Sequence, residues 1–157
     1  RWTWELPQTI FGLAYSKGRN WAGKVDAVQH YRGATYVIDE NRGKQNGITI
    51  GSFINMNDRD AKPINENGDF DPTQDGMYMH EYGHYLQSMK YGWGYLISHG
   101  IPSLFDAKKS KPINKYLSTH DIFWVEIDAN QKAKKYFEEN ENVDDWNELM
   151  YPVTYPF

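Results

Sequence analysis

Cysteine is absent from the 157 residues of the chain. Disulfide bonds and cysteine-based zinc sites are therefore excluded, and only histidine, aspartate or glutamate side chains could hold a metal ion. Long apolar runs are also missing, since none approaches the roughly 20 residues that a membrane-spanning helix requires. The first residues lack the basic-then-apolar order of an export signal. We therefore expect a domain that does not insert into a membrane.

An excess of positive charge is also missing. The 17 lysines and arginines are outnumbered by 21 acidic residues, which gives a formal net charge of -4. No basic block is long or dense enough to follow a phosphate backbone, so nucleic acid is not an expected partner. Residues 108–111 contain three lysines, and we interpret this short cluster as a solvated loop.

The length suits one domain over residues 1–157, which is enough to bury roughly 70% of the surface of the unfolded chain. Because the chain begins at Arg1 rather than at methionine, we expect it to be excised from a longer polypeptide. A signal for export would then lie upstream of this fragment.

The first lobe, about residues 1–91, is predicted to hold a short helix, a small and mainly antiparallel sheet, and a long helix. Arg32-Gly33 and Asn46-Gly47 are read as turns, and Asp71 as the N-cap of the long helix, with Pro72 at its first position. The helices are expected at 7–15, with a stop at 17–20, and at 72–91; the strands at 25–31, 34–38 and 48–56; and a long polar loop at 57–71.

The second lobe, about residues 92–157, is predicted to be mostly helical. Short helical turns and loops are expected over 92–118 because Gly94, Gly100 and Pro102 interrupt the apolar groups there. A second long helix is expected to begin at 118–121, where several side chains could cap it, and to continue to Phe137. The predicted fold class is therefore α+β.

Residues 80–84 read His80-Glu81-Tyr82-Gly83-His84. On a helix, residues four apart differ by only about 40° around the axis, so both imidazoles would face one metal ion. Glu81 would lie about 100° from His80, where it could take a proton from a metal-bound water without binding the metal. Glycine is unfavourable in a helix by about 1 kcal/mol, so Gly83 indicates the close approach of another segment.

The third ligand must come from elsewhere, because Gln87 and Lys90 occupy the positions that a three-histidine metzincin site would require. Glu126 falls within an apolar stripe of the second long helix, and a buried ionised carboxylate is costly unless it is paired or bound to metal. Asn130, one turn further on, could orient a ligand imidazole. Asp128 points away and is expected to be solvated or ion-paired.

These two segments resemble the gluzincin branch of the zincin metallopeptidases, whose pattern is His-Glu-x-x-His followed by Glu-x-x-Ala-Asp. The matching residues are His80 to His84 and Glu126-Ile127-Asp128-Ala129-Asn130. The resemblance implies Zn²⁺ held by His80, His84 and Glu126, with Glu81 as general base. Asn130 stands where the pattern usually has aspartate, so it would raise the basicity of its imidazole partner less.

The chemistry implied is peptide hydrolysis, in which zinc lowers the pKa of a bound water and Glu81 accepts its proton. A second group must stabilise the oxyanion. We expect His120, with Tyr85, Tyr91 and His99 left as alternatives. The strand before the active-site helix is where zincins bind extended substrate. The alternative function is a non-catalytic binding module with the same fold.

Residues 33–37, 79–88 and 120–124 more loosely resemble C-terminal domains of Rhs-type and other polymorphic toxins. This resemblance implies a secreted or delivered effector that cleaves a protein or peptide in a competing cell, with an immunity protein as its inhibitor. The aromatic tail, residues 151–157, is expected to pack on the surface rather than in the cleft.

Overall fold

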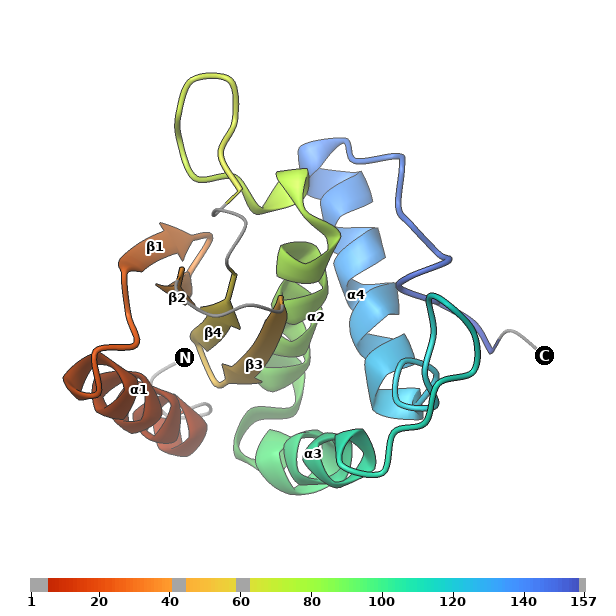
Figure 1. The fold of residues 1–157 in the computed structure, drawn as a ribbon, viewed down its shortest axis with the longest axis horizontal. Coiled ribbons are helices and arrows are strands. Elements are labelled where there is room, and N and C mark those ends of the chain that lie inside the picture. The colour runs from red at the N-terminus through yellow and green to blue at the C-terminus, as the bar shows by residue number, and fades with distance from the viewer. Residues whose placement is uncertain (1–5, 41–44, 59–62, 156–157) are drawn as a thin grey trace.

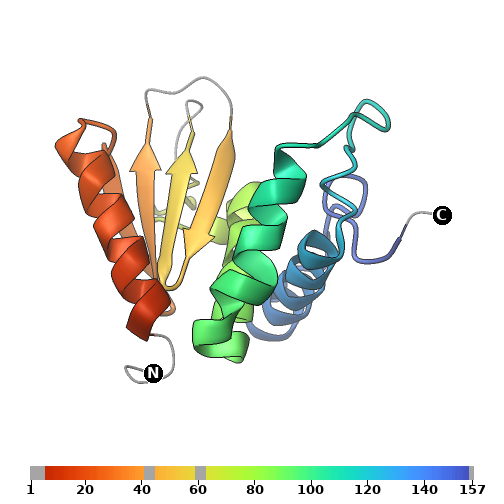
Figure 2. The ribbon, with the colours of Figure 1, turned by 90° about the horizontal axis from the view of Figure 1, so that it is seen from below.

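The computed structural model describes residues 6–40, 45–58 and 63–155. A four-stranded sheet separates helix α1 (Leu6–Trp21) from the paired helices α2 (Gly76–Tyr91) and α4 (Trp124–Glu141), as Figures 1 and 2 show. The architecture is α+β, as the sequence predicted. No helix in these ranges is both long and apolar enough to cross a membrane.

The sheet is mixed, with the order β1-β2-β4-β3. Its strands are β1 (Ala27–Tyr31), β2 (Ala34–Asp39), β3 (Asn46–Ile50) and β4 (Phe53–Asn57). The β1-β2 and β3-β4 pairs are antiparallel, whereas β2 and β4 run parallel. The predicted β1-β2 turn at Arg32-Gly33 is present, with positive φ at both residues. This order leaves β3 at an edge.

The predicted single strand over 48–56 is wrong. The segment is a hairpin of β3 and β4 that turns at Gly51, whose φ of +60° suits glycine. Asn46-Gly47 does not form a turn but begins β3. Gly47 is needed there for a tertiary reason, because a Cβ at this position would lie 2.5 Å from the Glu81 side chain.

One face of the sheet and the helix pair α2-α4 enclose the core. Alternate strand residues point inward from β2 and β4. Each large side chain buried here contributes about 1.5–3 kcal/mol. The fully buried members include Tyr36 and Ile38 from β2, Ile54 and Met56 from β4, Tyr78 and Tyr82 from α2, and Phe137 from α4.

Helix α1 covers the other face and is longer than predicted. The expected stop at 17–20 is wrong because Arg19 binds the sheet through Asn57 Oδ1, at 2.6 Å, and the Met56 carbonyl, at 3.2 Å. These tertiary contacts hold the last turn helical to Trp21. The chain leaves the helix at Gly23, where φ is +66°.

Helix α2 begins later than predicted. Asp71 caps a separate 3-10 turn, η1 (Pro72–Gln74), and Asp75 caps α2 by accepting from the Met77 and Tyr78 amides. The predicted end is confirmed: α2 stops at Tyr91, and Gly92 follows with φ +57°. The sequence therefore located the helix that carries both histidines.

Residues 92–107 form more helix than expected: η2 (Gly92–Gly94), the π-helical turn η3 (Leu96–Gly100) and α3 (Ile101–Ala107). Helix α4 begins at Trp124, so the predicted start at 118–121 is wrong. Asp121 instead accepts hydrogen bonds from the amide and hydroxyl of Ser118, which closes a turn before the helix. Residues 118–123 are therefore not helical, and His120 and Asp121 from this turn line a cavity described below.

Candidate metal centre

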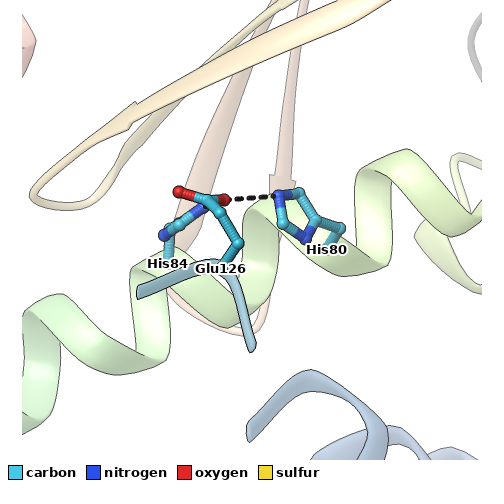
Figure 3. Close-up of side chains that lie close together, drawn as sticks. All are labelled: His80, His84 and Glu126. Carbon is cyan, nitrogen blue, oxygen red and sulfur yellow. Dashed lines mark hydrogen bonds and ion pairs between the residues drawn. The ribbon is translucent and has the colours of Figure 1, made fainter. Parts of the chain in front are cut away.

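The side chains of His80, His84 and Glu126 meet between α2 and α4 (Figure 3). Glu126 Oε2 lies 2.9 Å from His84 Nε2 and 3.4 Å from His80 Nε2. One potential ligand atom from each residue falls within 4.8 Å of the others, which is the geometry of a group that could hold a metal ion. Glu126 and His84 are buried, at 3% and 7% exposure.

Close packing of α2 against α4 brings Glu126 to the histidines. A Cβ added at Gly83 would overlap the Ala129 carbonyl oxygen and lie 3.1 Å from Ala133 Cβ. Glycine on one helix and alanines on the other therefore allow the two backbones to approach. This is the close contact that Gly83 predicted.

The outer nitrogen of each imidazole is held by an amide oxygen. Asn130 Oδ1 lies 2.6 Å from His80 Nδ1, and Gln87 Oε1 lies 2.9 Å from His84 Nδ1. Both amides have their orientation set by other contacts, since Asn130 Nδ2 donates to the Pro152 carbonyl and Gln87 Nε2 to the Val125 carbonyl. An amide oxygen can only accept, so both Nδ1 atoms carry the proton.

This tautomer aims both Nε2 atoms at Glu126. In a neutral imidazole with Nδ1 protonated, Nε2 is an acceptor, and so is the Glu126 carboxylate. Two acceptors at 2.9 Å repel each other unless a cation or a proton lies between them. The donor set of two imidazole nitrogens and one carboxylate oxygen matches zinc sites, so these residues fit the predicted ion.

The electrostatics of the metal-free protein agree with this argument. Burial by itself lowers the pKa of His84, but the charge and hydrogen bond of Glu126 outweigh it and raise that pKa to about 9. Burial likewise opposes ionisation of Glu126, yet His84 and His80 hold its pKa well below the ordinary value. Without metal, a proton on His84 therefore provides the positive charge that the carboxylate requires.

Glu81 lies beside the group, on the side of β3. It is 5% exposed, and its Oε2 accepts a hydrogen bond of 2.6 Å from the Thr49 hydroxyl. Both residues line a cavity of about 360 Å³, together with His80, His84 and Glu126. The carboxylate thus faces the same space as the candidate ligands without joining their cluster.

His120 also lines this cavity, as the sequence analysis expected for a catalytic residue. Its Nδ1 lies 3.1 Å from Asp106 Oδ2 and its Nε2 3.7 Å from Glu126 Oε1. Of the alternatives, Tyr85 is buried in the core, and His99 stacks on Tyr91. None of these three is among the residues that line the cavity.

Asp128 does not approach the candidate ligands. It pairs with Lys132 and accepts a hydrogen bond of 2.7 Å from Gln87 Nε2. Burial opposes its ionisation, but the hydrogen bonds from Lys132 and Gln87 lower its pKa. The expectation of an ion-paired Asp128 is confirmed.

Four site residues escaped the sequence analysis. Gln87 had a usable signal, since it lies three residues after His84 on the same helix. Asp106, Ser103 and Tyr95 had none, because the fold of residues 92–107 brings Ser103 and Tyr95 to the cavity and Asp106 to His120. Ser103 donates to Glu126 Oε1 at 2.6 Å, and Tyr95 lines the cavity, where burial raises the pKa of its phenol.

The tail packs against the outer side of the centre. The Tyr151 ring stacks on His80, with 5.6 Å between centroids, and occupies the space that a side chain at Gly76 would need. No residue of 151–155 lines the cavity, which agrees with surface packing, while residues 156–157 lie outside the described part of the chain.

The chain matches no protein-family model, no curated protein and no solved structure.

Proposed function

We propose that this chain is a zinc-dependent metallopeptidase of the gluzincin type, with a zincin-like fold. The observation that carries the proposal is the convergence of two Nε2 acceptors, from the buried His84 and the partly buried His80, on one carboxylate oxygen, at 2.9 and 3.4 Å. A structural role for these residues does not account for Glu81, a carboxylate held next to the cluster and facing the cavity.

His80, His84 and Glu126 would hold the ion, with Asn130 and Gln87 orienting the two imidazoles. Three protein ligands leave one position of a tetrahedral site open to solvent or substrate. When bound there, zinc would acidify a water molecule and polarise the peptide carbonyl. The cavity provides the room for both.

Glu81 would act as general base. The Thr49 hydroxyl donates to Oε2, which fixes the carboxylate and leaves Oε1 to accept a proton from water. Glu81 would then return that proton to the leaving amine. Gly47 contributes by leaving room for the carboxylate against β3.

The edge strand β3 would align the substrate. All five of its residues line the cavity, and β4 is its only partner among the strands that the structure describes. An extended peptide could therefore add to β3 through main-chain hydrogen bonds. Such a peptide would lie across the cavity beside Glu81.

His120 would stabilise the oxyanion. Asp106 accepts from Nδ1–H at 3.1 Å, so a neutral ring has no proton on Nε2, and His120 would donate from Nε2–H to the oxyanion as the doubly protonated imidazolium, whose charge Asp106 balances. Asp106 is therefore a positioning residue that acts through His120. Tyr95, which also lines the cavity, carries a phenol hydroxyl and is the alternative candidate for stabilising the oxyanion.

The direct test uses Glu81→Gln. A peptide library would be incubated with the zinc-loaded protein, and cleavage products would be identified by mass spectrometry. We expect the variant to retain one zinc per chain and to lose cleavage by at least a thousandfold. Glu139→Gln, at an exposed α4 residue, is the matched control and should cleave normally. Equal cleavage by the two variants would refute the mechanism.

The same experiment separates the enzyme from a binding module. A wild-type protein that binds zinc and cleaves no member of the library would favour the module. The proposal of a delivered toxin with an immunity partner adds a cellular prediction: expression should arrest growth, and Glu81→Gln should relieve the arrest.

A further inference from the structure

Helix α1 has its apolar side chains on the outside. The residues that it buries are Gln8, which faces α2, and Gly12 and Ser16, which face the sheet. Gln8 bonds Ser88, and Ser16 bonds Asn55. The outer surface instead carries large apolar side chains with the following exposed fractions: Leu6 38%, Ile10 54%, Phe11 64%, Leu13 42% and Trp21 87%. A surface helix normally shows the opposite pattern.

The segment η3-α3 shows the same inversion. Its inward-facing residues are polar: His99 is buried, and Ser103 and Asp106 bond the candidate site. Its large exposed side chains are apolar, at Ile97 67%, Ile101 47%, Leu104 48% and Phe105 61%. Exposed apolar surface on this scale marks an interaction site.

Both elements lie on the same side of the molecule. Figure 1 shows α1 and α3 along its lower edge, and Figure 2, seen from below, shows both in front with the edge of the sheet between them. Leu104 belongs to the exposed stripe and also lines the cavity. The cavity beside β3 therefore borders this apolar face.

Positive charge borders the same face. Residues 6–25 and 92–115, which contain both elements, hold seven lysines and arginines but one acidic residue, in a chain whose net charge is -4. Of the seven, Arg19 binds the sheet and does not belong to the outer face. The one acidic residue, Asp106, is held by His120. Lys108, Lys109, Lys111 and Lys115 are exposed and form no ion pair with any residue that the structure describes.

We propose that this face, formed by α1 and η3-α3, binds the surface of an anionic lipid bilayer, with the metal cavity held at the membrane interface. Apolar side chains, tryptophan among them, would enter the headgroup region, and the lysines would contact anionic headgroups. This inference concerns a surface outside the candidate metal centre and holds whether or not the centre is catalytic.

Charge favours lipid over a second copy of the chain. A symmetric dimer through this face would place two basic surfaces against each other, and like charges brought together oppose association. An anionic bilayer offers negative headgroups to the lysines and an apolar layer beneath them to the exposed apolar side chains. One partner thus complements both the charge and the apolar surface of this face.

The test is co-sedimentation of the whole chain with vesicles, at 0.1 M salt. We expect binding to vesicles of phosphatidylcholine and phosphatidylglycerol (7:3) and at least tenfold weaker binding to phosphatidylcholine alone. Lys108→Gln with Lys109→Gln should weaken binding roughly fivefold for each lysine. Ile101→Ser with Phe105→Ser should weaken it at least tenfold. Melting curves would verify that both double variants remain folded.

Matched controls lie on other surfaces. Leu149→Ser, at 72% exposure, and Lys135→Gln, whose side chain is 74% exposed, should bind as the wild type does. The proposal is overturned by absence of binding to the anionic vesicles, or by equal losses in control and test variants. It is also overturned if the chain dimerises without lipid and Ile101→Ser with Phe105→Ser yields monomers, since a second copy would then cover the face.

Discussion

Alanine at Gly83 is expected to push α2 away from α4. The added Cβ would overlap the Ala129 carbonyl oxygen and lie 2.8 Å from its carbon. Because the obstacle is backbone, no rotamer change can relieve it, and α4 must move by roughly 1 Å to restore an ordinary contact of about 3.5 Å.

The size of the effect follows from two opposing terms. Overpacking of this kind costs up to about 3 kcal/mol, whereas replacing glycine by alanine in a helix gains about 1 kcal/mol. The net loss is therefore up to about 2 kcal/mol, which corresponds to a melting temperature lower by up to about 4–8 °C for a domain of this length. The same movement would withdraw Glu126 from the histidines and weaken zinc binding.

Gly18→Ala is the matched control. Gly18 is exposed within α1, and a Cβ there would meet nothing within 4 Å. This variant should be more stable by about 0.5–1 kcal/mol, because only the helix preference changes. Urea unfolding with a chelator present would measure both variants without a contribution from metal. If Gly83→Ala proves as stable as Gly18→Ala, the close helix approach is wrong.

Other predictions concern the residues around the candidate ligands. Glu126 raises the pKa of His84 to about 9, above the ordinary 6.5. The pair therefore stabilises the metal-free protein fully below pH 6.5, and this contribution is lost as the pH rises to 9. Glu126→Gln should abolish that pH dependence in urea unfolding titrations, and an unchanged pH profile of the variant would contradict the pairing. At pH 7.5, zinc should displace the His84 proton, so calorimetry should give a binding enthalpy that depends on the buffer; independence from the buffer would argue against a charged His84. Asn130→Ala should weaken zinc binding about 10–100-fold, whereas Gln131→Ala, which loses only a bond to the Val153 carbonyl, should not; equal affinities would remove Asn130 from the centre. Asp106→Asn should lower kcat with little change in KM and shift the pH profile of kcat, because His120 loses the carboxylate that orients it. An unaltered pH profile would favour Tyr95 as the group that stabilises the oxyanion.

The clustering of His80, His84 and Glu126 could be predicted from the sequence because its main signals are local. The helical repeat alone puts His80 and His84 on one face, and the Gly83 backbone demands a close neighbour. Glu126 could be proposed because a carboxylate within an apolar stripe requires a cation. Each of these arguments needs only the residues of one helix.

Features that depend on tertiary contacts could not be predicted in this way. Asn46-Gly47 has the composition of a turn, yet Gly47 lies in a strand to make room for Glu81. Helix α1 continues past Gly18, within the predicted stop, because Arg19 forms hydrogen bonds to the sheet. Asp106 reaches His120 only after residues 92–107 have folded beside the cavity. The proposal of a gluzincin-type site rests on the two short motifs and on the side chains that they bring together.

The central claim is that His80, His84 and Glu126 hold one zinc ion, and a crystal structure grown with zinc, with diffraction recorded on both sides of the zinc absorption edge, tests it most directly. The account predicts a single strong anomalous peak about 2.0–2.2 Å from both Nε2 atoms and from a Glu126 oxygen, with Glu81 outside bonding distance. A peak ligated by other residues, or zinc-saturated crystals with no peak between α2 and α4, would contradict it.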